Sequence, residues 1–206
     1  MLFGYDVGQA MDYSAFGVMN KTMVGKQKEY QVPHLERFPL NMSYPAQISK
    51  IKNRIQTLGV EDDHTIVVDA TGVGKPVLDI MEVNGLNVIG VVITGGQKYR
   101  YDLDTGCYNV PKRDIISTLQ VLFQNKQIKF ASGMEFTDIL IKELINFKVK
   151  ITKARNETYE AWREGDHDDL VLMLGVVAWY AVEFGETNNV KRKPVQQHPL
   201  VTIQGL

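Results

Sequence analysis

The stretch Thr65-Ile66-Val67-Val68-Asp69-Ala70-Thr71-Gly72 is a run of β-branched residues that ends in an aspartate and a glycine turn. Such a short apolar run is typical of a strand buried on both faces of a parallel sheet. A similar run, Leu2-Phe3-Gly4-Tyr5-Asp6-Val7-Gly8, stands at the start of the sequence. We expect these two strands to be parallel neighbours near the centre of a sheet, with both aspartates at matched positions.

The residues around these runs alternate between strand and helix patterns. Further strands are predicted over Ser14–Thr22, Glu29–Phe38, Asn87–Thr94 and Ile128–Phe130, and a hairpin over Gly95–Val110. The first three strands form an antiparallel meander, in which Pro33 favours a sheet edge or a bulge. Helices are predicted over residues 45–58, 75–84, 111–125, 134–147 and 168–184, and an extended segment over 148–154.

This order predicts an α/β fold: a mixed central sheet with three antiparallel strands followed by parallel strands, helices on both faces, and a β-hairpin. A chain of 206 residues corresponds to about one domain. We expect that domain over residues 1–184 and a polar, mobile tail over 185–206.

Composition excludes several function classes. The 23 basic and 24 acidic residues give a net charge of −1, so no positive field of the whole chain attracts nucleic acid. Cys107 is the only cysteine, which rules out an intrachain disulfide or a multi-cysteine zinc site. No apolar run reaches the length of a membrane span, and no signal-peptide pattern is present. We therefore expect no membrane partner.

Asp6 and Asp69 are the first candidates for chemistry. Burying a carboxylate costs several kcal/mol unless a cation or hydrogen bonds offset it. If the two strands lie about 4.8 Å apart, both carboxylates reach one cation. The alternative is that each aspartate braces a turn or caps the following helix.

The second candidate is Gly165-Asp166-His167-Asp168-Asp169, directly before an apolar helix. One aspartate would suffice to cap the helix. Three acids and a histidine exceed that need, and a divalent cation would relieve their repulsion. Together with Asp6 and Asp69, these carboxylates fit one or two Mg²⁺ or Mn²⁺ ions, which prefer oxygen ligands.

Positive charge is concentrated on the hairpin and the helix after it, at Lys98, Arg100, Lys112 and Arg113, with tyrosines interleaved. This combination is typical of a DNA phosphate contact, although a solvated hairpin with ordinary surface charges fits it equally well. The run Thr71–Lys75 is not a phosphate-binding loop of an ATPase, because Pro76 stands where serine or threonine is required. We expect no ATPase activity.

Four motifs, in order, carry a resemblance. They are Asp6-Val7-Gly8 with Asp12-Tyr13-Ser14-Ala15, Val68–Gly74, Val110–Asp114 and Gly165–Val171. The set resembles the nuclease domain of the bacteriophage terminase large subunit, a member of the RNase H-like superfamily. The resemblance implies a metal-dependent endodeoxyribonuclease that cuts concatemeric viral double-stranded DNA in the host cell cytoplasm by a two-metal mechanism.

The resemblance also implies site residues and partners. Asp6, Asp69 and Asp169 match the catalytic carboxylates, with Asp168 as a further metal ligand. Asp12, Asp166 and His167 match residues just outside them. The implied partners are the ATPase domain of the same subunit, the terminase small subunit and the portal protein. Two alternatives remain open: a junction resolvase or transposase-type nuclease of the same fold, and a non-catalytic docking module of the packaging machine.

Overall fold

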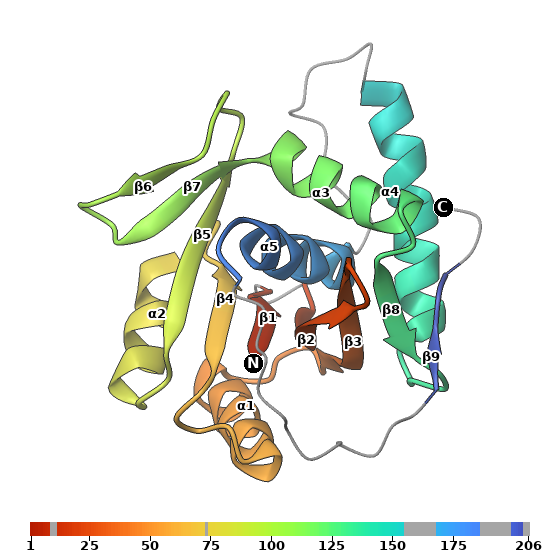
Figure 1. Cartoon of the computed structure of the whole chain (residues 1–206). Helices are drawn as coiled ribbons and strands as arrows, with labels where there is room; N and C mark the ends of the chain where they lie inside the picture. The colour runs from red at the N-terminus through yellow and green to blue at the C-terminus, as the bar shows by residue number, and fades with distance from the viewer. Residues whose placement is uncertain (9–11, 73, 155–167, 186–198, 204–206) are drawn as a thin grey trace.

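The computed structural model describes residues 1–8, 12–72, 74–154, 168–185 and 199–203. Within these ranges the strands form one nine-stranded mixed sheet in the order β6-β7-β5-β4-β1-β2-β3-β8-β9 (Figure 1). The strands are β1 (Leu2–Asp6), β2 (Ser14–Val24), β3 (Gln27–Phe38), β4 (Thr65–Asp69), β5 (Val88–Thr94), β6 (Arg100–Asp102), β7 (Cys107–Pro111), β8 (Ile128–Ala131) and β9 (Leu200–Val201). The helices are α1 (Tyr44–Leu58), α2 (Gly74–Val83), α3 (Lys112–Gln124), α4 (Thr137–Ala154) and α5 (Asp169–Glu183).

The predicted fold class is confirmed. Strands β1, β2 and β3 form the antiparallel meander, and β1 pairs in parallel with β4 near the centre of the sheet. Helices cover both faces: α1 and α2 pack on one, and α3, α4 and α5 on the other. Among the described residues, no helix has the length and apolar character needed to cross a bilayer.

Two local predictions differ from the structure. The segment Lys148–Ala154, predicted to be extended, continues helix α4. Its β-branched residues lower helix propensity by only tenths of a kcal/mol each, so a helix that has already formed extends through them. Strand β9 was not predicted; it lies within the 185–206 segment and pairs antiparallel with the edge of β8.

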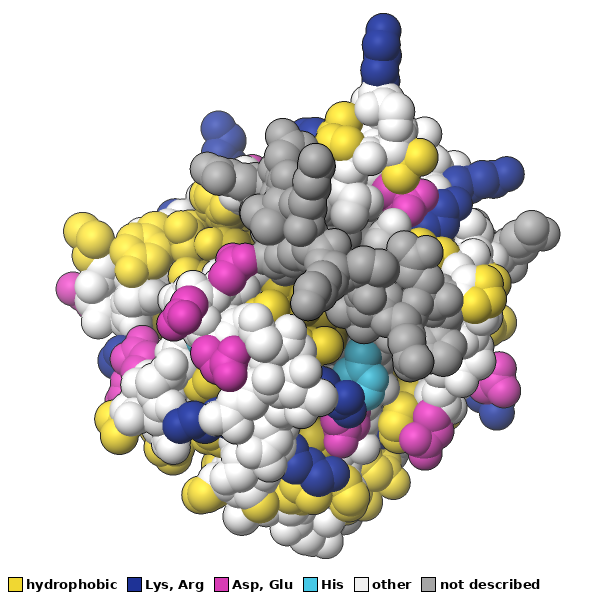
Figure 2. Space-filling view, turned by 60° about the horizontal axis from the view of Figure 1, so that its bottom comes forward, with side chains coloured by type: hydrophobic (Ala, Val, Ile, Leu, Met, Phe, Trp, Pro, Cys, Tyr) yellow, Lys and Arg dark blue, Asp and Glu magenta, His cyan; other side chains and the backbone are white. Residues whose placement is uncertain are grey.

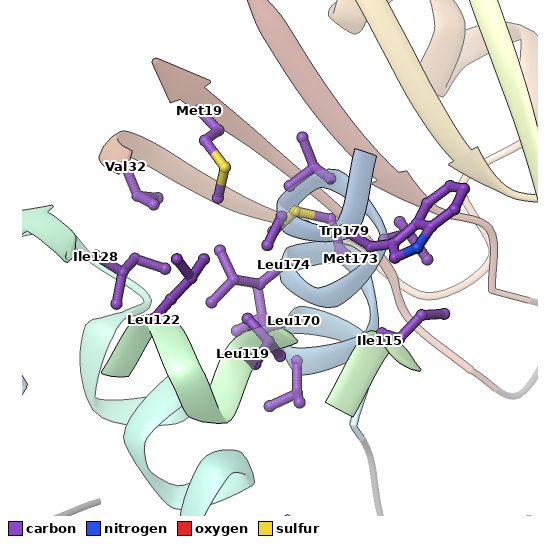
Figure 3. Close-up of a cluster of buried hydrophobic side chains, with 14 of the residues drawn as sticks. Met19, Val32, Ile115, Leu119, Leu122, Ile128, Leu170, Met173, Leu174 and Trp179 are labelled. Atoms are coloured by element: carbon purple, nitrogen blue, oxygen red, sulfur yellow. The ribbon is translucent and has the colours of Figure 1, made fainter. Parts of the chain in front are cut away.

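The core beneath α5 is mainly aliphatic. Figure 3 shows Met173, Leu174 and Trp179 of α5 among side chains from α3, β2, β3 and β8. Side chains of Phe3, Phe16 and Phe38 stack on the opposite face of the sheet, under α1. The sheet is therefore covered by two separate cores, and the strand ends between them carry the polar side chains considered next.

Candidate active site

The two central strands bring Asp6 and Asp69 together. They are register partners across the parallel β1–β4 pair, and both are buried, at 9% and 5% exposure. Neighbouring Tyr5 and Val68 point to the face covered by α1 and α2. Because side chains alternate along a strand, Asp6 and Asp69 point to the opposite face, under α5.

Helix α5 adds Asp169 to this pair. Gly4 of β1 and Gly17 of β2 are register partners, and a Cβ on either would lie 2.7 Å from the Met173 side chain. The absence of these side chains lets α5 lie directly on the sheet. Asp169 precedes Met173 by one helical turn, about 6 Å, and Asp6 follows Gly4 by two strand residues, about 6.6 Å. Asp169, which is 7% exposed, is close enough to Asp6 for the two carboxylates to repel each other.

The electrostatics of Asp6 indicate that several carboxylates lie near enough to repel it. Burial raises the pKa of Asp6 well above its usual range, and repulsion from Asp69, Asp169, Asp168 and Glu143 raises it further, in that order of size. A carboxylate becomes hard to ionise when nearby negative charges exceed the positive charges available to offset them. This site therefore favours an added cation.

Glu143 of α4 performs the helix capping that the sequence suggested for an aspartate. Its Oε2 accepts hydrogen bonds from the backbone N–H groups of Leu170 and Val171, at 3.0 and 3.2 Å. Asp168, at the N-cap position of α5, makes no side-chain cap hydrogen bond. Because Glu143 already caps the helix, Asp168 and Asp169 are not needed for that purpose. Burial raises the pKa of Glu143 to about 7, and Asp169 adds to the rise while Arg37 and the two N–H groups oppose it.

Arg37 is a basic side chain that contacts two of these acids. Its Nη2 lies 2.6 Å from Asp169 Oδ2 and 3.0 Å from Glu143 Oε1, and its guanidinium lies 4.2 Å from the Tyr13 ring centre. Asp69, Asp6, Ala15 and Arg37 are successive register partners across β4, β1, β2 and β3. Arg37 thus belongs to the same row and the same face as the two strand aspartates.

A β-bulge gives Arg37 this direction. The β2–β3 register shifts between Val18 and Asn20, which leaves one extra residue in β3 beside Pro33. Before the shift Tyr30 and Val32 face the α5 side, and after it Leu35 does. A bulge re-aims the side chains that follow it. Without this one, Arg37 would point to the α1 side, away from the aspartates. Pro33 was expected at a sheet edge or at a bulge, and the structure confirms the bulge.

The donor set fits a hard divalent cation. It consists of carboxylate oxygens from two strands and a helix start, and these carboxylates repel one another at Asp6. Asp69 also braces a turn, because its Oδ1 accepts the N–H of Thr71 at 2.8 Å. Within the described ranges, no three acidic, histidine or cysteine side chains are arranged closely enough to hold an ion. One Asp169 oxygen is instead engaged by Arg37.

The remaining predicted site residues differ in position. Asp12 is exposed in the turn between β1 and β2. Asp166 and His167 lie outside the described residues. Arg37 and Glu143 were not predicted from the sequence at all. The only signal for Arg37 was the bulge expected at Pro33, and Glu143 follows an ordinary helical pattern.

The basic residues lie around the β6–β7 hairpin and the start of α3. Lys98 and Arg100 are exposed and Lys112 is half-buried. Arg113 donates hydrogen bonds to the Oε1 and the backbone carbonyl of Gln97, which ties the start of α3 to the segment before β6. Tyr101 packs on Tyr108 within the hairpin, at 5.0 Å between ring centres.

Comparisons with known proteins identify the fold. No protein-family model matches the sequence, and no curated protein matches it. The large terminase nuclease from thermophilic phage G20c with bound magnesium is similar over 86% of this chain and 79% of that one, with 20% identity and a TM-score of 0.55. The zinc-bound form of the same nuclease is similar over 87% of this chain and 79% of that one, with 20% identity and a TM-score of 0.49. Thermus thermophilus RuvC is similar over 87% of this chain and 92% of that one, with 10% identity and a TM-score of 0.40. The chain has the RNase H-like fold of the terminase nuclease.

Proposed function

We propose that this chain is a divalent-metal-dependent endonuclease that hydrolyses the phosphodiesters of double-stranded DNA, as the nuclease domain of a phage packaging terminase. One observation carries the proposal. On an RNase H-like sheet, Asp6 and Asp69 are buried register partners, and Asp169 of α5 is near enough to raise the pKa of Asp6 by repulsion.

Asp6, Asp69 and Asp169, with Asp168, would hold Mg²⁺ or Mn²⁺, and the number of carboxylates suits two ions. Bound divalent ions of this kind activate water and stabilise the leaving oxygen of a phosphodiester. The chain itself supplies rigid placement. Asp6 and Asp69 are held by the parallel strand pair, and Asp169 by the glycine-lined contact between α5 and the sheet. We propose supporting roles around the ions for Asp12, Asp166 and His167.

Lys98, Arg100, Lys112 and Arg113 would contact DNA phosphates. Acidic and basic side chains are interspersed on the face seen in Figure 2, and the net charge is −1, so a local group of cations suits the role better than a broad field. Contacts to phosphate carry no sequence information, so we expect cutting without sequence preference. The ATPase domain of the same subunit, the small subunit and the portal protein would be its partners.

The test is cleavage of supercoiled plasmid by the purified chain in MnCl₂ or MgCl₂, with EDTA as the blank. We expect nicked and linear products with either metal, and none in EDTA. Asp6→Ala, Asp69→Ala and Asp169→Ala should each lower the rate by at least about 100-fold, since each removes a ligand of the ions that activate water. Asp79→Ala is the matched control, because Asp79 is an exposed carboxylate paired with Lys75 on α2.

The proposal is wrong if the wild-type chain leaves plasmid intact and shows no Mn²⁺ binding by calorimetry. In that case a docking role without catalysis is the better conclusion. Equal rates for Asp6→Ala and Asp79→Ala would contradict the assigned site even if the chain cuts DNA. Cleavage confined to four-way junctions, with linear duplex left uncut, would contradict the packaging role.

A further inference from the structure

Arg37 is unusual among the groups at this site because it is a buried cation on the carboxylates that would hold the metal. Its side chain is 11% exposed, and those of Glu143 and Asp169 are less exposed still. A single nitrogen, Nη2, contacts both acids. In the resting arrangement, Arg37 thus supplies part of the positive charge that a divalent cation would supply.

The contact is not a rigid clamp. A bidentate arginine–carboxylate pair uses two nitrogens against two oxygens of one acid, which adds geometric specificity and strength. Here one nitrogen is divided between two acids, and the buried Nε has no hydrogen-bond partner among the described residues. Asp169 can therefore leave Arg37 with the loss of a single hydrogen bond, since no bidentate pair has to be broken.

Glu143 is a second carboxylate partner of Arg37. It lies 3.0 Å from Nη2 through Oε1, while its Oε2 is fixed by the N–H groups at the start of α5. If Asp169 turned from Arg37 toward a cation, the guanidinium would still be paired with a carboxylate. The Tyr13 ring beneath the guanidinium also stays in contact. A buried arginine left without any partner would make the exchange costly, and this arrangement avoids that cost.

We propose that Arg37 competes with the divalent cation for Asp169, so that the Arg37–Asp169 pair marks the metal-free state and loading of the site requires its release. The inference rests on the proposed function and concerns its regulation. Several carboxylates repel Asp6, yet no three of the described acidic side chains are close enough together to bind one ion. Competition by Arg37 for Asp169 accounts for this difference. Arg37 then stabilises the metal-free protein and reduces its affinity for metal by the same coupling free energy.

A thermodynamic cycle between Arg37 and the metal tests this. The variants are Arg37→Met, which keeps much of the side-chain length but removes the charge, and Arg54→Met as control. Arg54 lies 4.0 Å from Glu36, a neighbour of Arg37 whose side chain points to the opposite face. The unfolding temperature of each protein is measured in EDTA and in saturating MnCl₂, and the Kd for Mn²⁺ is measured by calorimetry.

Competition predicts that Arg37→Met binds Mn²⁺ more tightly, by about tenfold. It also predicts a Tm loss of roughly 5–10 °C in EDTA, because breaking a buried pair leaves charges without partners. That loss should shrink to less than half in saturating MnCl₂. Arg54→Met should change Tm equally in both buffers and leave the Kd unchanged. If Arg37→Met does not fold, Arg37→Lys, which keeps the charge but lacks the broad guanidinium, should still tighten Mn²⁺ binding, by a smaller factor.

Two results would overturn the inference while leaving the proposed function standing. An equal Tm loss in both buffers with an unchanged Kd would make Arg37 a structural brace. A larger loss in MnCl₂ with weaker binding would make it a positioning residue that cooperates with the metal. If the wild-type chain itself shows no Mn²⁺-induced Tm shift, the metal site is absent and both proposals fail together.

Discussion

The two faces of the central strands differ in what they are built to do. On the α1 face, Phe3 and Phe16 stack with ring centres 5.6 Å apart and are fully buried. On the α5 face, the same strands carry Gly4 and Gly17, where α5 touches backbone. The α1 face is stabilised by burial of large apolar side chains. The α5 face lacks such side chains at Gly4 and Gly17, and this allows α5 to pack close to the strands. We infer that the apolar packing on the α1 face supplies the stability needed to bury carboxylates on the α5 face.

The largest effect on stability is expected on the α1 face. Phe16→Ala removes a fully buried ring that contacts both Phe3 and Phe38, and such truncations cost about 3–5 kcal/mol. The free energy of unfolding, measured in urea, should fall by that amount. Mn²⁺ affinity measured at low temperature, where the variant remains folded, should equal that of the wild type. A loss of affinity in the folded variant would show that the two faces are not separable.

The next largest effect is expected at Gly4, and it should disturb the site as well as stability. The new Cβ in Gly4→Ala would lie 2.7 Å from Met173 Sδ and 2.8 Å from its backbone carbonyl oxygen. Overpacking of this kind costs about 1–3 kcal/mol and displaces the helix that carries Asp169. We expect weaker Mn²⁺ binding together with the loss of stability, measured by calorimetry and urea unfolding.

Gly95→Ala is the control for this change, because a Cβ there meets no atom within 4 Å. It should leave stability within about 0.5 kcal/mol and metal affinity unaltered. If Gly4→Ala destabilised the chain without changing Mn²⁺ affinity, the position of α5 would not govern the site.

The strand aspartates could be placed from the sequence because each follows a short apolar run and is itself followed within three residues by a glycine. That pattern predicts a parallel pair, and the register of Asp6 with Asp69 confirms it. The place of Asp169 was harder to predict, because it depends on the close contact of α5 with Gly4 and Gly17, which arises from tertiary packing.

Arg37 and Glu143 could not be found in the same way. Arg37 faces the site only because one extra residue in β3 reverses the alternation after Pro33, and sequence patterns locate such a shift poorly. Glu143 occupies an ordinary helical position, and its capping role joins residues 27 positions apart. Sequence periodicity describes each element separately, whereas these two roles arise between elements.

The α5 face should lose stability as pH rises. The pKa of Asp6 is raised by burial and by neighbouring carboxylates, so the folded chain binds a proton that the unfolded chain releases. Stability in EDTA therefore declines as pH increases through that raised pKa. Asp6→Asn removes this contribution, and its Tm should exceed that of the wild type by a margin that grows toward neutral pH. Each kcal/mol of relieved repulsion corresponds to about 2–4 °C in a chain of this size.

Saturating MnCl₂ sharpens this test. It should raise the Tm of the wild type, because metal binds the folded chain, and should raise that of Asp6→Asn much less. A wild-type Tm in EDTA that exceeds the variant's at every pH from 5 to 8 would contradict the repulsion inferred at Asp6.

The smallest effect, with the opposite sign, is expected from Glu36 on the α1 side. The His34 imidazole, 3.5 Å from Glu36, and the nearby Lys50 ammonium lower the pKa of Glu36. This group therefore stabilises the fold above its unfolded pKa and loses that contribution as pH falls. Because Glu36 is partly exposed, Glu36→Gln should cost less than about 1 kcal/mol at pH 7. The cost should vanish below the carboxyl range and decrease in high salt. Thermal unfolding from pH 3 to 7 measures it, and a difference between Glu36→Gln and wild type that persists at pH 3 would assign the loss to packing instead of charge.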